Sequence, residues 1–467
     1  MADQIGFVDS ITTEPAERLS LSNGAMTVLR DGTDLSPAPL RRAESSGFLE
    51  HGSRTSAAAY GDRVLQLHLQ VLGEDDDEIA TQIQALVQQL DQPNILRWHP
   101  ATATHPVFMR TKRCSIEGLE EILSTHRRAI VPIPAEPFGL GLPITLGPTL
   151  VSNDPSAGCY VDIPFPDGDL DTPVRLTVLG ADVIAAGGRE SVIAMRRRGT
   201  PGNAPSWLPA SSMTPSAGSG STTFPGHDAA MAGAGNNYAH LTGLPDDEFE
   251  TRLTALHPAV PSLDAPGKYR TWFRLRRANG SDELRVRLAV SPDGVTELLP
   301  DPTGVVLPAG TVMRWCDVGV FQNPIGDDPR VDSMTGLFLP SGGVQLRVQA
   351  ARTTGTTSNL DINGVMTLPA DDRLGQVAWP SVAGPTQLVL DSVRGPKLYA
   401  LGASGETLGI SRGLSGGMPL ISPLAYNRLW WLLDGGLKST AGDDLLETFT
   451  AWVTYQPRYA YLRPPTG

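Results

Sequence analysis

The stretch GDRVLQLHLQVLGEDDDEIATQIQALVQQLDQP, residues 61–93, predicts a long β-strand that passes directly into an amphipathic α-helix. In the strand, Leu65, Leu67 and Leu69 alternate with polar residues, which is the period of a strand with one buried and one solvated face. Such alternation is typical of an antiparallel sheet that is covered on one side only. We therefore expect the helix that follows to supply the cover.

The predicted helix has a well-specified beginning and end. Asp75 can serve as N-cap, with Glu78 three residues later as in a capping box. Pro93 ends the helix because its ring blocks further helical backbone. Apolar residues recur at helical spacing, which predicts that one face of the helix docks on the sheet. The expected core residues of this face are Ile79, Ile83, Leu86 and Leu90.

Length and composition favour several domains with many turns. The chain has 49 glycines and 40 prolines among 467 residues, well above the roughly 12% that these two residues make up in average proteins. Its formal net charge of −13 argues against a surface built to bind phosphates. We therefore expect no nucleic-acid-specific site.

Cysteine use and hydropathy exclude further classes. Cys114, Cys159 and Cys316 are odd in number and far apart, so they predict neither a disulfide framework nor a zinc site. No apolar run approaches the roughly 20 residues of a membrane helix, and the first residues lack the pattern of a signal peptide. We expect a soluble protein made in a cytoplasm, with buried thiols, no membrane insertion and no cofactor.

The remainder of the chain predicts antiparallel β-sandwich structure. Alternating segments suited to sandwich strands occur at residues 174–179, 269–277, 283–290, 344–350 and 449–455. We expect an N-terminal domain at residues 1–137 and a β-sandwich at residues 138–352. Residues 353–467 are expected to form either a second sandwich or a continuation of the first.

One segment is expected to lie outside these strands. Residues 199–226 consist mostly of Gly, Pro, Ser and Thr, which favour turns and bury little. We expect a long surface loop, which could equally serve in binding.

Two short motifs bear on catalysis and metal binding. GLSGG, centred on Ser415, matches a nucleophile elbow, but no histidine follows His257 to complete the triad in that order. Asp167, Asp169 and Asp171 begin like a calcium loop, yet the sixth and twelfth positions lack the required glycine and glutamate. We expect a turn between strands in each case, and neither a catalytic nor a metal site.

Exposed aromatic rings are a further candidate site, because rings on β-sandwiches can stack on sugars. Trp272 shares a strand face with Arg270, Arg274 and Arg276, and Trp207 lies in the polar segment. Both tryptophans are candidates for carbohydrate binding. The alternative is that each ring covers the edge of a sandwich.

The order of several segments resembles a known family. The segments are residues 61–98, VPIPAEPFG (131–139), GDLDTPVRLTVLG (168–180), NRLWWLLDGG (427–436) and WVTYQPRYAYLRP (452–464). In this order they resemble the distal tail and related minor tail proteins of long-tailed, siphovirus-like bacteriophages of actinobacterial hosts.

The resemblance implies a mainly β protein with a structural role. Its N-terminal α+β domain, a sheet with one packed helix, would form a homo-oligomeric ring, expected to be a hexamer, at the end of the tail tube. A galectin-like or carbohydrate-module-like jelly roll would follow, as one sandwich or two. The implied partners are other copies, the tail tube protein and other tail-tip proteins, in a virion assembled in the host cytoplasm.

Two other functions stay open. The first alternative is a carbohydrate-binding module that attaches to host cell-surface glycans. The second, less favoured, is a hydrolase of cell walls or polysaccharides, which only GLSGG and the many carboxylates suggest.

Overall fold

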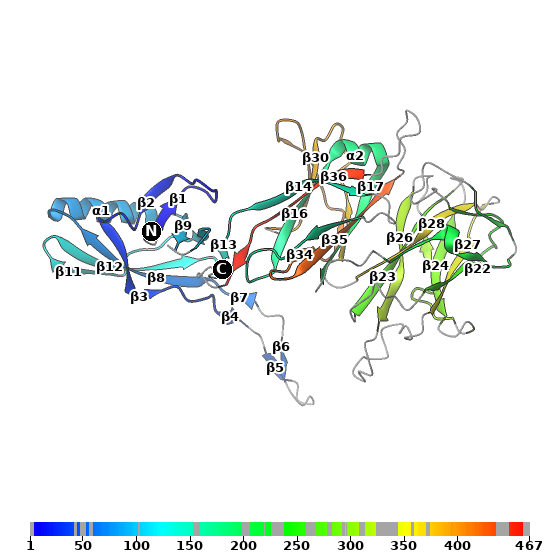
Figure 1. The fold of residues 1–467 in the computed structure, drawn as a ribbon, viewed down its shortest axis with the longest axis horizontal. Coiled ribbons are helices and arrows are strands. Elements are labelled where there is room, and N and C mark those ends of the chain that lie inside the picture. The colour runs from blue at the N-terminus through cyan, green and yellow to red at the C-terminus, as the bar shows by residue number, and fades with distance from the viewer. Residues whose placement is uncertain are drawn as a thin grey trace.

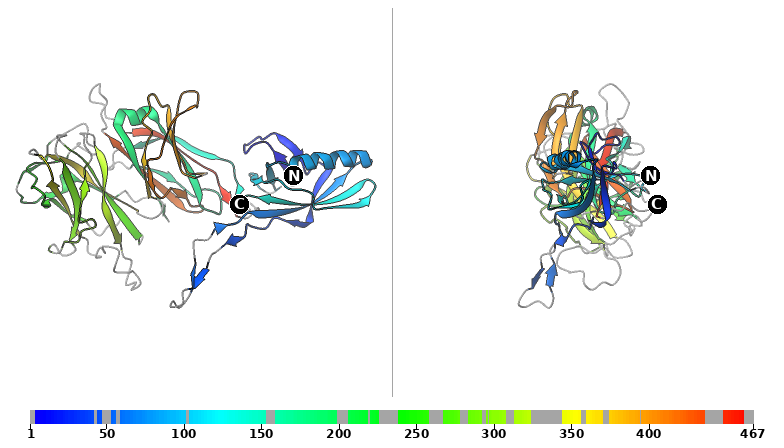
Figure 2. Two further views of the ribbon diagram at one scale, coloured as in Figure 1. Left: turned by 180° about the vertical axis from the view of Figure 1, so that it is seen from behind. Right: turned by 90° about the vertical axis from the view of Figure 1, so that its left-hand side faces the viewer.

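The computed structural model arranges the chain as three units in a row, as Figure 1 and Figure 2 show: an N-terminal sheet with its helix, a middle sandwich and an outer sandwich. The chain is mainly β, as predicted. Neither of the two α-helices in the described part is long and apolar enough to span a membrane. The structure describes residues 4–41, 44–46, 53–55, 59–100, 103–152, 159–198, 206–218, 220–225, 238–257, 267–277, 283–291, 295, 297–307, 313–323, 344–355, 359–369, 374–393, 395–435 and 448–460.

The N-terminal unit is an antiparallel sheet with the order β2-β1-β9-β10-β12-β8-β3. Strands β8 and β12 pair along their whole length, from Leu72 opposite His126 to Arg63 opposite Ala135. Strand β11 pairs with the first half of β12. The elements are β1 (Gln4–Val8), β2 (Glu17–Ser20), β3 (Met26–Asp34), β8 (Arg63–Leu72), α1 (Asp76–Leu90), β9 (Asn94–His99), β10 (Val107–Thr111), β11 (Gly118–Leu123), β12 (His126–Ala135) and β13 (Gly139–Leu140).

Helix α1 covers one face of this sheet, as the sequence predicted. The Asp75 carboxylate accepts a hydrogen bond from the Glu78 backbone N–H at 2.9 Å, and the Glu78 carboxylate accepts one from the Glu74 N–H at 2.7 Å. The first bond satisfies a donor that a helix start leaves unpaired, and the second holds the residue that precedes the N-cap. Ile83 is partly buried and packs on the core. The other expected core residues are buried: Leu65, Leu67, Leu69, Ile79, Leu86 and Leu90.

Two short ladders form an arm that leaves the N-terminal sheet beside the middle sandwich (Figure 1). They connect β3 to β8 in the chain. Strand β4 (Leu40–Arg41) pairs with β7 (Ala59–Tyr60), and β5 (Glu44–Ser46) pairs with β6 (Ser53–Thr55).

The middle sandwich combines two segments that lie far apart in the sequence. One sheet has the order β14-β36-β16-β30-β31-β32, with β34 paired to β16, and the other has the order β15-β35-β17-β29-β33. Helix α2 (Gly180–Ala186) contacts strands of both sheets. The strands are β14 (Ile144–Ser152), β15 (Tyr160–Ile163), β16 (Thr172–Leu179), β17 (Gly187–Arg198), β29 (Leu374–Ala378), β30 (Gln387–Asp391), β31 (Lys397–Leu401), β32 (Thr407–Ser411), β33 (Leu414–Gly416), β34 (Leu420–Ile421), β35 (Tyr426–Gly435) and β36 (Thr448–Tyr455).

The outer sandwich is inserted between those two segments. Its sheets have the orders β20-β21-β28-β23-β26, with β18 also paired to β28, and β19-β22-β27-β24-β25. The elements are β18 (Ser206–Pro209), η1 (Ala210–Ser212), β19 (Thr214–Pro215), β20 (Thr222–Thr223), β21 (Ala239–Leu241), β22 (Glu250–His257), β23 (Gly267–Arg277), β24 (Leu284–Ser291), β25 (Val305–Val306), β26 (Arg314–Asn323), β27 (Val344–Arg352) and β28 (Leu360–Pro369).

This pairing does not follow the expected domain boundary between residues 352 and 353. Strands β27 and β28, on either side of that boundary, belong to the two facing sheets of the outer sandwich. The chain between these two strands therefore connects the two sheets of one sandwich and does not separate two domains. Sequence alternation could not reveal the insertion, because it identifies strands and not their partners.

The expectation of a surface loop at residues 199–226 needs correction where the structure describes this segment, at residues 206–218 and 220–225; the rest of it lies outside the described residues. Strand β18 pairs with β28, and Ala210 and Met213 lie buried in the core of the outer sandwich. The turn-rich composition indicated the bends correctly. It concealed two apolar side chains that anchor the segment.

The four sandwich sheets stack as four layers. Separate apolar cores lie between the two sheets of each sandwich, and a third cluster lies between the sandwiches. The central strands of the two inner sheets are consequently buried on both faces. Every residue from Asn427 to Asp434 of β35 is buried, as is every residue from Leu360 to Leu368 of β28.

Candidate functional site: an assembly edge and two joints

Strand β11 presents apolar side chains to solvent at the end of the molecule farthest from the sandwiches (Figure 1). Leu119, Ile122 and Leu123 are 50%, 49% and 62% exposed. In the described part of the chain β11 pairs only with β12, so its other edge is open. An open strand edge with exposed apolar side chains is a template for association with another chain.

The hairpin of β11 and β12 is tied to the helix. The guanidinium of Arg127 lies 2.8 Å from the Asp76 carboxylate and 3.5 Å from that of Glu121. Arg127 of β12 thus connects Glu121 of β11 with Asp76 at the start of α1. The exposed apolar residues of β11 therefore lie on a strand whose place relative to α1 is fixed by side-chain contacts.

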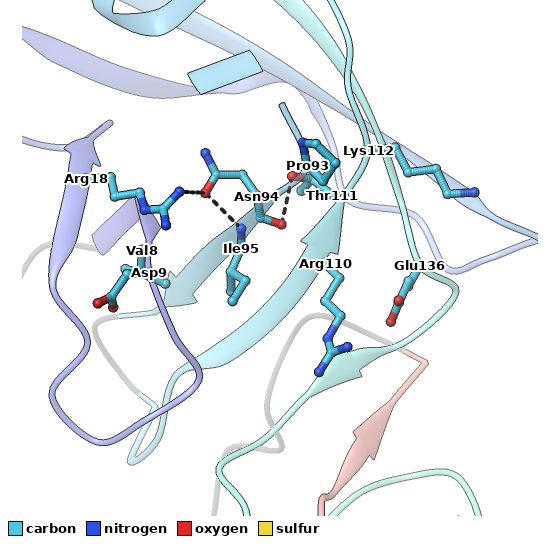
Figure 3. A pocket seen from close by; sticks show the side chains of 10 residues that line it. All are labelled: Val8, Asp9, Arg18, Pro93, Asn94, Ile95, Arg110, Thr111, Lys112 and Glu136. Atoms are coloured by element: carbon cyan, nitrogen blue, oxygen red, sulfur yellow. Dashed lines mark hydrogen bonds between the residues drawn. The ribbon is translucent and has the colours of Figure 1, made fainter. Parts of the chain in front are cut away.

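A cleft of about 460 Å³ lies where β1, β9 and β10 come together, as Figure 3 shows. Its lining combines Arg18, Arg110 and Lys112 with the carboxylates of Asp9 and Glu136. Burial raises the pKa of the Glu136 carboxyl, and this outweighs the nearby cations of Arg458 and Lys112. Because the lining mixes both signs of charge, it defines no single class of ligand.

The first joint connects the N-terminal sheet to the middle sandwich by strand pairing. The C-terminal strand β37 (Arg458–Tyr459) pairs with β13, and β13 pairs with β10. The Gly141 N–H also donates to the Pro457 carbonyl at 2.9 Å, and the Gln456 amide donates to the Gly141 carbonyl at 2.9 Å. The chain therefore leaves the N-terminal unit and returns to it at the same place.

A buried arginine completes this joint. Arg63 is 1% exposed, and its Nη2 donates to the Ala460 carbonyl at 2.6 Å. The Ala460 N–H in turn donates to the Asp169 carboxylate at 2.6 Å. Burial lowers the pKa of Arg63, whereas the charge of Asp169 raises it. The backbone of Ala460 is thus hydrogen-bonded both to Arg63 of the N-terminal sheet and to Asp169 of the middle sandwich.

The second joint, between the two sandwiches, is an apolar contact rich in tryptophan. Strand β35 of the middle sandwich contributes Trp430, and the outer sandwich contributes Trp272 and Trp315. The ring of Trp207 packs edge-on against that of Trp315, with centroids 6.0 Å apart. The remaining buried members are Cys159, Val192, Ala194, Met366, Leu368, Leu374 and Leu432.

One carboxylate lies buried in the second joint. Asp434, at the end of β35, is 4% exposed and accepts a hydrogen bond from the Trp315 backbone N–H at 2.8 Å. Burial raises the pKa of Asp434 to about 7, despite this hydrogen bond. Burial and the Asp434 charge together raise the pKa of the Cys316 thiol to about 12.

The two tryptophans predicted as sugar platforms lie in this joint. Trp272 is 1% exposed, so the expectation that its ring faces solvent is wrong. Trp207 is partly buried, and its ring lies where a side chain on Gly364 would stand, 2.4 Å from the position of a Cβ. The neighbouring arginines suggested that the strand face of Trp272 is solvated. One of them, Arg274, is instead fully buried and donates a hydrogen bond to the Asn363 side chain at 2.9 Å.

The two short motifs differ in outcome: Ser415 of GLSGG lies in a strand and not in the expected turn, whereas Asp167, Asp169 and Asp171 lie between strands β15 and β16, as expected. Ser415 belongs to β33, which pairs with β29, and the next element in the described part of the chain is strand β34. Among the described residues, no group of three or more His, Cys, Asp or Glu side chains is arranged to hold a metal ion. His240 pairs with Asp361 at 2.6 Å, while His227 lies outside the described residues. Sequence reasoning did not anticipate the roles of Arg63, Asp169 and Asp434, because partners far apart in the chain define them.

The chain matches no known family model and no curated protein sequence. Among solved structures it is similar to the Dit protein of phage SPP1, described as a paradigm of the hub adsorption apparatus in phages that infect Gram-positive bacteria, with 8% identity over 98% of this chain and 99% of that chain and a TM-score of 0.37. It is also similar to a chain of the activated phage P2 baseplate, with 7% identity over 99% of this chain and 100% of that one and a TM-score of 0.29. TM-scores this low do not establish a common fold.

Proposed function

We propose that this protein is a structural component of a phage tail tip. Its N-terminal unit assembles with other copies into a ring, expected to be a hexamer, at the end of the tail tube. The two sandwiches project from that ring toward the host-adsorption apparatus. The protein acts as a connector and not as an enzyme.

The observation that carries this proposal is the open apolar edge of β11 at one end of an elongated molecule. Leu119, Ile122 and Leu123 suit a contact between N-terminal units, while the sandwiches lie at the opposite end (Figure 1). The strand-paired first joint suits a part that must keep its direction relative to a ring. The ordered sequence segments that resemble distal tail proteins point the same way.

The test is the oligomeric state of the purified chain and of matched variants. We expect a closed ring by mass measurement and electron microscopy, and its loss in Ile122→Lys, because a charge cannot be buried unpaired in the contact. Leu150→Lys, on β14 of the middle sandwich, is the control, since Leu150 is 68% exposed away from this edge. A wild-type protein that stays monomeric at high concentration and is absent from virions would overturn the proposal.

Carbohydrate binding through Trp207 and Trp272 receives less support. Both rings pack in the second joint, where they cannot stack on a sugar while the sandwiches are docked. A hydrolase centred on Ser415 receives no support, because Ser415 lies within strand β33 and the next described element is another strand, where a nucleophile elbow requires a helix.

A further inference from the structure

We propose that the contact between the two sandwiches is a proton-sensitive joint, in which the outer sandwich docks more tightly on the middle one when Asp434 is neutral than when it is ionised. The inference concerns one chain and goes beyond the proposed assembly into a ring. Protonation would thereby set how rigidly the outer sandwich is held.

The geometry places this carboxyl across the joint. Asp434 belongs to β35 of the middle sandwich, and its hydrogen-bond donor, the Trp315 N–H, belongs to β26 of the outer sandwich. Trp315 is 4% exposed, so both ends of this bond are shielded from water. When the sandwiches separate, the carboxyl gains solvent and loses its partner.

The charged groups around Asp434 come from three other strands. Glu190 of β17 raises the pKa of Asp434, whereas Arg314 of β26 and Arg274 of β23 lower it. The pKa of the nearby Cys316 thiol of β26 responds to Asp434, but this side chain lies in the core of the outer sandwich and stays neutral, because its pKa is raised to about 12. Removal from water outweighs these charges and favours the neutral carboxyl in the docked state.

The sign of the effect follows from linkage. Docked, the Asp434 carboxyl has a pKa of about 7; released into water, it has the ordinary value of roughly 3.9. Docking therefore takes up a proton between these values and weakens as pH rises, by up to about tenfold in the docking constant per pH unit. Above a pH of about 7 the carboxyl is ionised in both states, and the dependence levels off.

The second joint also contains buried hydrogen-bond donors that have no acceptor among the described residues. The indole N–H groups of Trp272, Trp315 and Trp430 are buried without a hydrogen-bond partner among the described residues. Each buried, unpaired donor destabilises the docked state, because it would form a hydrogen bond with water if the two sandwiches separated. The apolar contact between the sandwiches is thus weaker than burial of the indole rings alone would make it. Protonation of one carboxyl can therefore shift the equilibrium between the docked and the separated state.

The test measures the opening of the joint as a function of pH. Hydrogen exchange of the β26 backbone, corrected for intrinsic exchange rates, is followed in the full chain from pH 4.5 to 8, in steps of about half a unit. We expect protection of the Trp315 amide to fall by up to about tenfold per pH unit up to a pH of about 7 and then to stay level. Protection that is independent of pH, or that rises with pH, would overturn the proposal.

Three variants separate this effect from general destabilisation. Asp434→Asn keeps an oxygen acceptor for the Trp315 N–H and should abolish the pH dependence. Glu190→Gln should move the levelling point to lower pH, because it removes a charge that raises the Asp434 pKa. Asp361→Asn alters another buried carboxylate of the outer sandwich and should leave the slope unchanged. An unchanged slope in Asp434→Asn, or no shift in Glu190→Gln, would contradict the assignment.

Discussion

The joint between the N-terminal sheet and the middle sandwich is held by strand pairing, whereas the joint between the two sandwiches is held by packed indole rings. In the first, β37 extends the N-terminal sheet through β13, and Arg63 closes the contact. In the second, the buried Trp272, Trp315 and Trp430 meet across two sheet faces. Backbone pairing fixes direction and register, while apolar contact fixes only proximity. The first joint is therefore suited to orientation and the second to adjustment.

The largest expected effect breaks the second joint. Trp272→Ala removes a fully buried indole and should cost about 3–5 kcal/mol, as large-to-small core changes of aromatic residues do. Calorimetry should then resolve an earlier transition for the outer sandwich, because its docking is lost with its packing. Trp452→Ala, at a half-buried position on β36, is the control and should cost less. A single unchanged transition in Trp272→Ala would mean that the rings do not hold the sandwiches together.

The same contrast explains what the sequence could predict. Strands whose apolar and polar residues alternate along the sequence, such as β8, β24, β27 and β36, were predicted from this period. The inner strand β35 is buried on both faces, and its apolar run from Leu429 to Leu433 carries no alternation. In the inner strand β28, Asp361 and Asn363 alternate with apolar residues as on a solvated face, although they too are buried. For this reason the stacking of the four sheets could not be predicted from the sequence.

The candidate site was less predictable than the fold. Trp272 stands among arginines at alternate positions, a pattern typical of a solvated face. A second sandwich from elsewhere in the chain covers that face. Arg63 and Ala460 meet from opposite ends of the sequence, and no local pattern encodes such a pair. Helix α1 was predictable because its cap, apolar face and terminating proline are all local.

An intermediate effect is expected when the buried arginine of the first joint is removed. Arg63→Met keeps an unbranched apolar stem but leaves the Ala460 carbonyl without this donor, which should cost about 1–3 kcal/mol. Urea unfolding followed by far-ultraviolet circular dichroism measures the change. Arg113→Met is the matched control, because Arg113 is 72% exposed and its ion pair with Asp91 contributes little. Equal effects of the two variants would show that Arg63 does not hold the joint.

The smallest expected effect concerns the aromatic side chain of Phe138, which borders the first joint. The Arg458 guanidinium lies 5.3 Å from the centroid of the Phe138 ring, and the Tyr60 ring meets Phe138 edge-on at 5.2 Å. Phe138→Leu keeps the apolar bulk and loses both ring contacts, for an expected cost of about 1 kcal/mol. Phe165→Leu, whose ring is 60% exposed, is the control in the same urea experiment. Because strand pairing and Arg63 remain, Phe138→Leu should lower the unfolding midpoint without loosening β37, so that exchange of its amides stays slow. If those amides became as labile as in Arg63→Met, side-chain packing rather than backbone pairing would hold the first joint, and the contrast between the two joints would fail.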